Sequence, residues 1–245
     1  MALVDYNKKN SIVTITINNP NRLNAVGREV TEGITDACKK YEDDKDARVA
    51  ILTGTGRSFC AGVDLNEVVG PQIIAQSHIV VRSVTKPVIA AVNGYAIGTG
   101  LFLMVACDMT IAAKSASFGA PEITRAIPLR PERLLAQGIP TCIIMELFFT
   151  GERINAQRAY DVGLINKVVP DEDLMFEAMK MAEKIAELSP WAVHLIKEAK
   201  IEALAISKDI LDKEEELRVM ARKTEDLKEA VTAFREKRKP VFKGK

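Results

Sequence analysis

The amino-acid sequence predicts an α/β core followed by a region made almost entirely of helices. Three observations lead to this prediction. Short apolar runs alternate with segments of helical periodicity, turns rich in Gly, Asn and Pro separate them, and after Pro170 the pattern is helical almost to the end. Such alternation is typical of folds in which helices pack on a sheet. With 245 residues, 47% of them hydrophobic, the chain is long enough for one large domain.

In the first part of the chain, strands and helices alternate. Val13, Ile15 and Ile17 alternate with threonines, and this period of two predicts a strand. Apolar residues recur at helical spacing over 26–41, and the apolar run 49–52 is typical of a strand buried on both faces. The same criteria predict the next three elements, a helix, a strand and a helix, at 65–84, 87–92 and 101–106.

Helices dominate the later part of the chain. Asn is a preferred residue at the N-cap of a helix, and Gly is preferred just beyond a helix end. Asn155 and Gly163 therefore predict a short helix between them. Four longer helices are expected at 171–188, 190–205, 208–222 and 225–238.

Composition excludes several classes of function. The net charge of +1 provides no basic surface for nucleic acid, and no uncharged run approaches the ~20 residues that a membrane-spanning helix needs. The four cysteines form no CxxC pair and no histidine lies at metal-ligand spacing, so no metal site is indicated. Because the N-terminus lacks an apolar signal segment, we expect a cytoplasmic protein, and a processed organellar form stays open.

Two turns that contain glycine are candidates for a functional site. Segments 58–64 and 93–100 each follow an expected buried strand and precede a helix. Glycine permits close backbone approach, and N–H groups at a helix start can bind a developing oxyanion. Two such turns together would hold one carbonyl oxygen between two N–H donors. Tight packing explains most turns of this kind, so these residues alone leave both interpretations open.

Several sequence blocks together resemble those of one enzyme family. The central blocks are 86–96, which reads KPVIAAVNGYA, and 118–123, which reads FGAPEI. Further matching blocks lie at 22–25, 59–64, 107–108, 147–151, 163–169 and 234–242. Because these blocks cover nearly the whole chain in the right order, the sequence is similar to the enoyl-CoA hydratase/isomerase (crotonase) family.

This resemblance implies a spiral of repeated ββα units and a C-terminal helical region that builds a homotrimer, often doubled to a dimer of trimers. The α/β core with the acyl-CoA site would be residues 1–190. Residues 191–245 would serve oligomerisation and close the CoA pocket. The implied substrate is an acyl-CoA thioester, whose coenzyme A is part of the substrate, so no metal or other cofactor is implied.

The resemblance also implies roles for individual residues. The backbone N–H groups of Val63 and Thr99 would polarise the thioester carbonyl, and Glu122 would be the catalytic acid/base. Eight further positions would contact the substrate, and these are Arg22, Ala25, Ala61, Asp64, Leu65, Phe102, Arg125 and Lys237.

The sequence departs from the family pattern at three places. Phe102 stands where family hydratases carry one of two glutamates, which favours double-bond isomerisation or specialised hydration or lyase chemistry over simple hydration. Thr99 replaces a glycine, and a β-branched residue would be strained at positive φ. The segment 124–133 is stiff and charged where the family has a Gly-rich loop. These departures keep open a catalytically inactive CoA-ester-binding paralogue.

The charged segment 124–133 offers two further candidates. Arg125 or Arg130 would pair with a carboxylate or carbonyl of an unusual acyl group, or else face solvent or a neighbouring subunit. Glu132 is either a second catalytic carboxylate or a member of a surface ion pair. His78 and His194 lie in expected helices and are interpreted as structural or surface residues.

Overall fold

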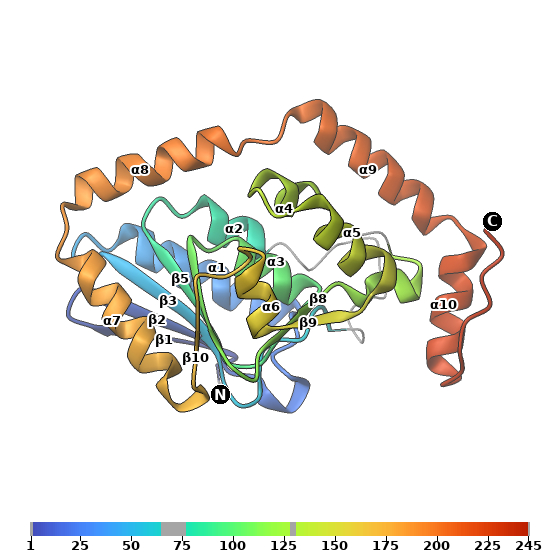
Figure 1. Ribbon diagram of the computed structural model, residues 1–245, viewed down its shortest axis with the longest axis horizontal. Coiled ribbons are helices and arrows are strands. Elements are labelled where there is room, and N and C mark those ends of the chain that lie inside the picture. Colours follow the sequence, from blue (N-terminus) through green and yellow to red (C-terminus); the bar gives the residue numbers. More distant parts are fainter. Residues whose placement is uncertain (1, 65–76, 128–130, 245) are drawn as a thin grey trace. The chain divides into compact units, whose positions relative to one another are not determined.

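The computed structural model describes residues 2–64, 77–127 and 131–244, and Figure 1 follows the chain by colour. Contacts within the chain define two compact units. Unit 1 comprises Met1–Phe118 and Ile154–Ala203, and unit 2 comprises Gly119–Arg153 and Leu204–Lys245. Leu65, which was predicted to contact the substrate, lies outside the described residues, as does Arg130.

The larger sheet of unit 1 has six strands in the order β1-β2-β3-β5-β7-β10. β1 pairs with β2 in antiparallel fashion, and the other four pairings are parallel. The continuous apolar runs of β3 and β5 are buried on both faces, as expected for central parallel strands. The six strands are β1 Val4–Lys9, β2 Ile12–Ile17, β3 Val49–Gly54, β5 Val88–Val92, β7 Met109–Ala113 and β10 Lys167–Val169.

A second, smaller sheet has the order β4-β6-β8-β9. β4, β6 and β8 each directly follow a strand of the larger sheet, so successive pairs place one strand in each sheet. This arrangement confirms the α/β class and the repeated pairs of strands. Each of these four strands is three residues long, which is too short for an alternation of apolar and polar residues to be recognised in the sequence. They are β4 Ser58–Cys60, β6 Tyr95–Ile97, β8 Ser117–Gly119 and β9 Arg153–Asn155.

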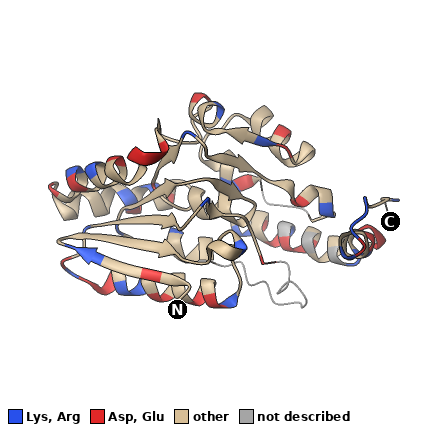
Figure 2. Cartoon of the chain, turned by 90° about the horizontal axis from the view of Figure 1, so that it is seen from below, with Lys and Arg blue, Asp and Glu red and all other residues tan. Residues whose placement is uncertain are grey.

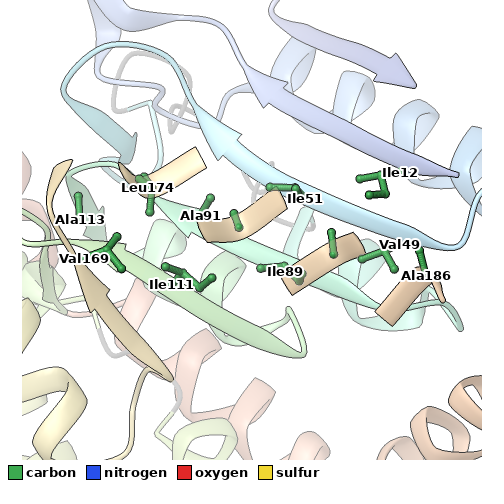
Figure 3. Packing of buried hydrophobic residues seen from close by; sticks show 12 residues of the cluster. Ile12, Val49, Ile51, Ile89, Ala91, Ile111, Ala113, Val169, Leu174 and Ala186 are labelled. Carbon is green, nitrogen blue, oxygen red and sulfur yellow. The ribbon is translucent and has the colours of Figure 1, made fainter. Parts of the chain in front are cut away.

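Helix α7, Leu174–Ala186, packs on one face of the larger sheet. Leu174, Ala178, Ala182 and Ala186 recur every four residues and therefore form one buried stripe along the helix. Figure 3 shows this stripe against apolar side chains of the central strands. The small alanines let the helix approach the branched side chains of the strands closely, which gives unit 1 a dense core.

The other helices of unit 1 agree with the sequence-based expectations within a few residues. Asn155 accepts a hydrogen bond from the backbone N–H of Arg158 at 2.8 Å and caps α6, and Gly163 has φ +77° beyond its end. Of the helix expected at 65–84, the described part is 77–83. These helices are α1 Arg28–Asp43, α2 Ser77–Ser83, α3 Thr99–Val105, α6 Ala156–Asp161 and α8 Pro190–Ala203, with short 3₁₀ turns η1 Pro20–Arg22 and η3 Asp171–Asp173.

A buried cluster of charges attaches α8 to the strands of unit 1. The side chain of Lys197 is only 6% exposed, and its ammonium donates to the carbonyl of Lys86 at 2.6 Å and lies 2.8 Å from an Asp108 oxygen. Lys200 pairs with the same carboxylate at 3.0 Å, and Asp108 also accepts the backbone N–H of Val88 at 2.8 Å. Through these contacts α8 packs within unit 1, whose second segment ends at Ala203.

Unit 2 is helical. The 3₁₀ helix η2 contacts both α5 and α10, so the unit joins two segments that are far apart in the sequence. Figure 2 shows that charged residues lie mainly on the helices, and the central strands carry few. No described helix combines the length and the apolar character that crossing a bilayer requires. The helices of unit 2 are η2 Pro121–Arg125, α4 Glu132–Ala136, α5 Thr141–Thr150, α9 Lys208–Arg222 and α10 Glu225–Arg235.

Candidate active site

The structure brings the two glycine turns of unit 1 side by side. β4 and β6, which precede the turns, pair in parallel through Ser58 and Tyr95. A Cβ atom added to Gly100 would lie 2.0 Å from the carbonyl oxygen of Cys60, and one added to Gly62 would lie 3.3 Å from that of Ile97. Glycine is therefore required at residue 100 by the close approach of the two backbones.

Two backbone N–H groups remain available in these turns. Among the described residues, the N–H groups of Val63 and Thr99 donate no hydrogen bond. Thr99 is the first residue of α3, where an N–H lacks a partner within the helix. The positive φ of +55° falls on Gly98 and not on Thr99, so the branched side chain causes no strain there. Both N–H groups can therefore donate to a developing oxyanion.

The turn 22–25 is held rigid by the buried side chain of Asn24. Its amide donates to the carbonyls of Thr55 at 2.9 Å and Ser58 at 2.5 Å and accepts the N–H of Asn19 at 2.9 Å. Leu23 and Asn24 adopt positive φ, at 53° and 57°. The side chain of Asn24 thus ties the turn to the start of β4 and fixes the positions of its neighbours.

A pocket of about 360 Å³ lies beside this turn, within unit 1. Its lining includes Arg22, Ala25 and Asp64, three of the predicted substrate-binding residues. The half-exposed guanidinium of Arg22 forms an ion pair with the buried carboxylate of Asp64. Asp64 directly follows Val63, the residue with one of the two available N–H groups. The remaining lining residues are Leu3, Asn19, Gly27, Glu29 and Val30.

Phe102 is buried on α3, and only 8% of it is exposed. Its ring centroid lies 6.0 Å from that of His78 on α2, with the rings tilted by 45°. Phe102 therefore places an aromatic surface, and no carboxylate, at this position. The contact with His78 could not be predicted from the sequence, because it depends on how α2 and α3 pack.

Glu122 lies in η2 of unit 2, in a poorly solvated position. Its Oε2 atom is inaccessible to solvent and has no hydrogen-bond partner. Burial disfavours the charged form and raises the pKa of Glu122 to about 7, although the positive charge of Arg125 opposes this rise. A carboxyl group that titrates near neutral pH can both accept and donate a proton, which is what a general acid/base requires.

Arg125 and Glu132 are the other charged residues of interest on this segment. The Arg125 guanidinium lies 5.8 Å from the ring centroid of Phe234 on α10. Both carboxylate oxygens of Glu132 are inaccessible to solvent, and Oε1 lies 4.0 Å from Nε of Arg133. The pair of Glu132 with Arg133 is therefore largely buried, and Glu132 is not a member of a surface ion pair, one of the two interpretations of the sequence.

Lys237 follows α10 on the basic tail and has φ +54°. Its neighbour Arg238 pairs with Glu229 and Glu236, and this contact lowers the pKa of Glu229 to about 2. No ion pair joins Lys237 to a described carboxylate, so its charge remains available for an anion.

The predicted site residues thus fall into two groups. In unit 1, the structure brings together the turns and the pocket that contain Arg22, Ala25, Ala61, Val63, Asp64 and Thr99, while Phe102 lies in α3. In unit 2, Glu122 and Arg125 share η2, and Lys237 follows the helix α10 that η2 contacts. Asn24 and Phe234, which hold functional candidates in place, were not predicted from the sequence.

Comparisons with known proteins agree along the whole chain. A family model described as enoyl-CoA hydratase/isomerase matches residues 7–245. The chain is 37% identical over 249 residues to a probable mitochondrial enoyl-CoA hydratase of Dictyostelium discoideum, covering 97% of this chain and 90% of that protein. It is 36% identical over 248 residues to (E)-benzylidenesuccinyl-CoA hydratase of Thauera aromatica, covering 96% of each. A carnitinyl-CoA hydratase structure from Mycobacterium avium matches with a TM-score of 0.89 at 32% identity, covering 100% of both chains.

Proposed function

The chain belongs to the enoyl-CoA hydratase/isomerase (crotonase) family, and on this premise we propose that it moves a proton on an unsaturated acyl-CoA thioester, with Glu122 as the acid/base. The observation that carries this proposal is the buried carboxyl of Glu122, whose pKa lies near neutrality. Burial with a pKa matched to the working pH is typical of catalytic acids and bases.

The proposed mechanism uses the available backbone donors of unit 1. The N–H groups of Val63 and Thr99 hydrogen-bond the thioester oxygen, and the carboxylate of Glu122 removes a proton from the carbon beside the carbonyl. The electron pair moves onto the thioester oxygen as an enolate, which the two donors stabilise. The protonated Glu122 then returns the proton to a different carbon, so the double bond shifts.

Phe102 favours this isomerisation over simple hydration. A second carboxylate would help to hold and activate a water, and an aromatic ring does neither. Hydration or elimination on a specialised acyl group is the second candidate, supported by the hydratase names of the relatives. The third is a CoA-ester-binding protein without activity.

A product assay distinguishes these candidates. The protein is incubated with 2-enoyl-CoA and 3-enoyl-CoA thioesters of matched chain length, and the products are followed by mass and by ultraviolet absorbance. Isomerisation leaves the mass unchanged and alters the absorbance of the conjugated thioester, whereas hydration adds the mass of water. Binding of these esters without any conversion would contradict the proposed activity and support the inactive paralogue.

The pH dependence of kcat/KM is expected to show an acid-side limb with a midpoint of about 7, the pKa of Glu122. Below the midpoint Glu122 holds a proton and cannot act as a base, so activity falls as the pH decreases. The measurement is kcat/KM for a 3-enoyl-CoA between pH 5 and 9 at constant ionic strength. A limb centred near 4.5, the ordinary value for Glu, would contradict the buried position of the catalytic carboxyl.

We also propose that the protein assembles as a homotrimer or a dimer of trimers through its C-terminal helices. Large apolar side chains on these helices are exposed in the single chain, with Trp191 at 69%, Ile196 at 72% and Met220 at 64%. Trp191 and Ile196 share α8, and apolar patches that are exposed on a protein surface mark interaction sites. Light scattering is expected to give three or six times the mass of one chain, and Ile196→Lys is expected to weaken the assembly more than Glu202→Lys. A stable monomer at micromolar concentration would contradict this proposal.

A further inference from the structure

Arg125 lies beside the proposed catalytic group for a geometric reason. A 3₁₀ helix has three residues per turn, so side chains three apart project from the same side. Glu122 and Arg125 are three residues apart on η2, and the charge of Arg125 acts on the Glu122 carboxyl. No ion pair joins the two side chains, so the guanidinium is near Glu122 but not neutralised by it.

The position of Arg125 is supported by an aromatic contact. Its guanidinium lies 5.8 Å from the ring centroid of Phe234, within the range of a cation–π interaction. Arg125 and Phe234 both belong to unit 2, and η2 contacts α10 there. An aromatic surface holds the planar guanidinium but leaves its N–H groups able to donate to another group.

Within the described part of the chain, Arg125 has no anionic partner. Among the described residues, no carboxylate forms an ion pair with it and no group accepts a hydrogen bond from its guanidinium. Its side chain is half-buried, and charges that are removed from water are usually paired. Partial burial, aromatic support and a position one 3₁₀ turn from Glu122 together leave its N–H groups oriented but without an anion.

We infer that Arg125 binds a carboxylate carried by the acyl group, so that the preferred substrates are CoA thioesters of unsaturated dicarboxylic acids. This inference rests on the proposed function, because it places the second carboxylate of the substrate beside Glu122. A guanidinium matches a carboxylate with two parallel N–H donors, which fixes the orientation of the acyl chain as well as its charge. The orientation in turn determines which carbon faces Glu122.

The test compares pairs of substrates that differ only in the second carboxylate. Unsaturated acyl-CoA thioesters of four to six carbons are prepared with and without a terminal carboxylate, and kcat/KM is measured for each. The wild-type protein is expected to prefer the carboxylated member. Arg125→Gln is expected to reduce this preference at least tenfold, since a hydrogen bond to a charged group contributes about 1.5–3 kcal/mol, roughly a 10–100-fold change.

Two further variants separate charge from orientation. Arg125→Lys keeps the charge but loses the planar pair of donors, so it is expected to retain only part of the preference. Phe234→Leu removes the aromatic support and is expected to reduce the preference roughly 2–5-fold. Lys228→Gln removes one positive charge from the exposed side of α10 and serves as the matched control, with the preference retained.

The outcomes separate the inference from the proposed function. If Arg125→Gln changes kcat/KM equally for both members of each pair, the inference is wrong and the proposed function stands. If light scattering shows that Arg125→Gln dissociates the protein, Arg125 is a subunit contact and the inference is likewise overturned. If the wild type converts neither member, the proposed function fails, and calorimetry with the saturated thioesters still tests whether Arg125 favours the carboxylated one.

Discussion

Replacement of Glu122 with Gln is expected to lower kcat by at least about 10², because general acid–base catalysis contributes typically 10²–10⁴-fold. Gln has nearly the same size as Glu and cannot accept a proton, so binding of the CoA ester should be nearly unchanged. The rate of conversion of a 3-enoyl-CoA is measured in single-turnover and steady-state experiments, and the Kd of the CoA ester is measured separately. Glu152→Gln, an exposed change in the same unit, is the matched control.

The same variant offers a check that does not depend on activity. The pKa of Glu122 is raised from 4.5 to about 7 in the folded protein, so the folded state holds a proton that the unfolded state has released between these values. The free energy of unfolding of the wild type should therefore decrease as the pH rises from about 4.5 through about 7. Glu122→Gln lacks this titration and should be the more stable protein at pH 8. Turnover that survives the replacement would transfer the role to Glu132, whose carboxylate oxygens are also inaccessible to solvent.

Asp108→Ala is expected to lower the free energy of unfolding by about 3–5 kcal/mol, because it removes one partner of a buried ion pair. The ammonium of Lys197 would stay buried and would keep its hydrogen bond to the carbonyl of Lys86. The backbone N–H of Val88 would also lose its acceptor. Unfolding in urea is measured at a fixed protein concentration, since assembly contributes to the apparent stability.

Two comparisons make the Asp108 measurement specific. Asp212→Ala removes one partner of the exposed Lys208–Asp212 pair and should change the stability far less, because surface pairs contribute little. The double variant Asp108→Ala with Lys197→Met removes the uncompensated charge and should recover part of the loss. A loss below about 1 kcal/mol for Asp108→Ala would mean that the ion cluster does not hold α8 on the strands.

The sequence predicted those features that depend on local patterns. The one-sided alternation at 12–17, the apolar run at 49–52 and the capped helix after Asn155 all became the expected elements. Their side-chain periods and caps are properties of neighbouring residues, so they can be read without knowledge of the rest of the chain. The candidate site residues came instead from the resemblance of whole sequence blocks to a family, and their roles stay predictions.

The features that the sequence did not predict depend on contacts between distant segments. The contact of His78 with Phe102 and that of Arg125 with Phe234 require the packing of separate helices. The burial of Lys197 is another case, because a lysine in a charged helix is usually solvated. The Lys197 ammonium helps to attach α8 to unit 1, and no local pattern distinguishes it from the exposed lysines nearby.

The path of the chain between the two units has a consequence for how such a protein can diversify. β8 and β9 are neighbours in the smaller sheet, and the segment between them, which contains Glu122 and Arg125, leaves and re-enters unit 1 at adjacent strands. A segment whose two ends are close can be lengthened, shortened or exchanged at little cost in loop closure. Grafting the corresponding segment of a relative between these strands would therefore exchange the proposed acid/base together with the proposed acyl-binding arginine and leave the larger sheet unchanged.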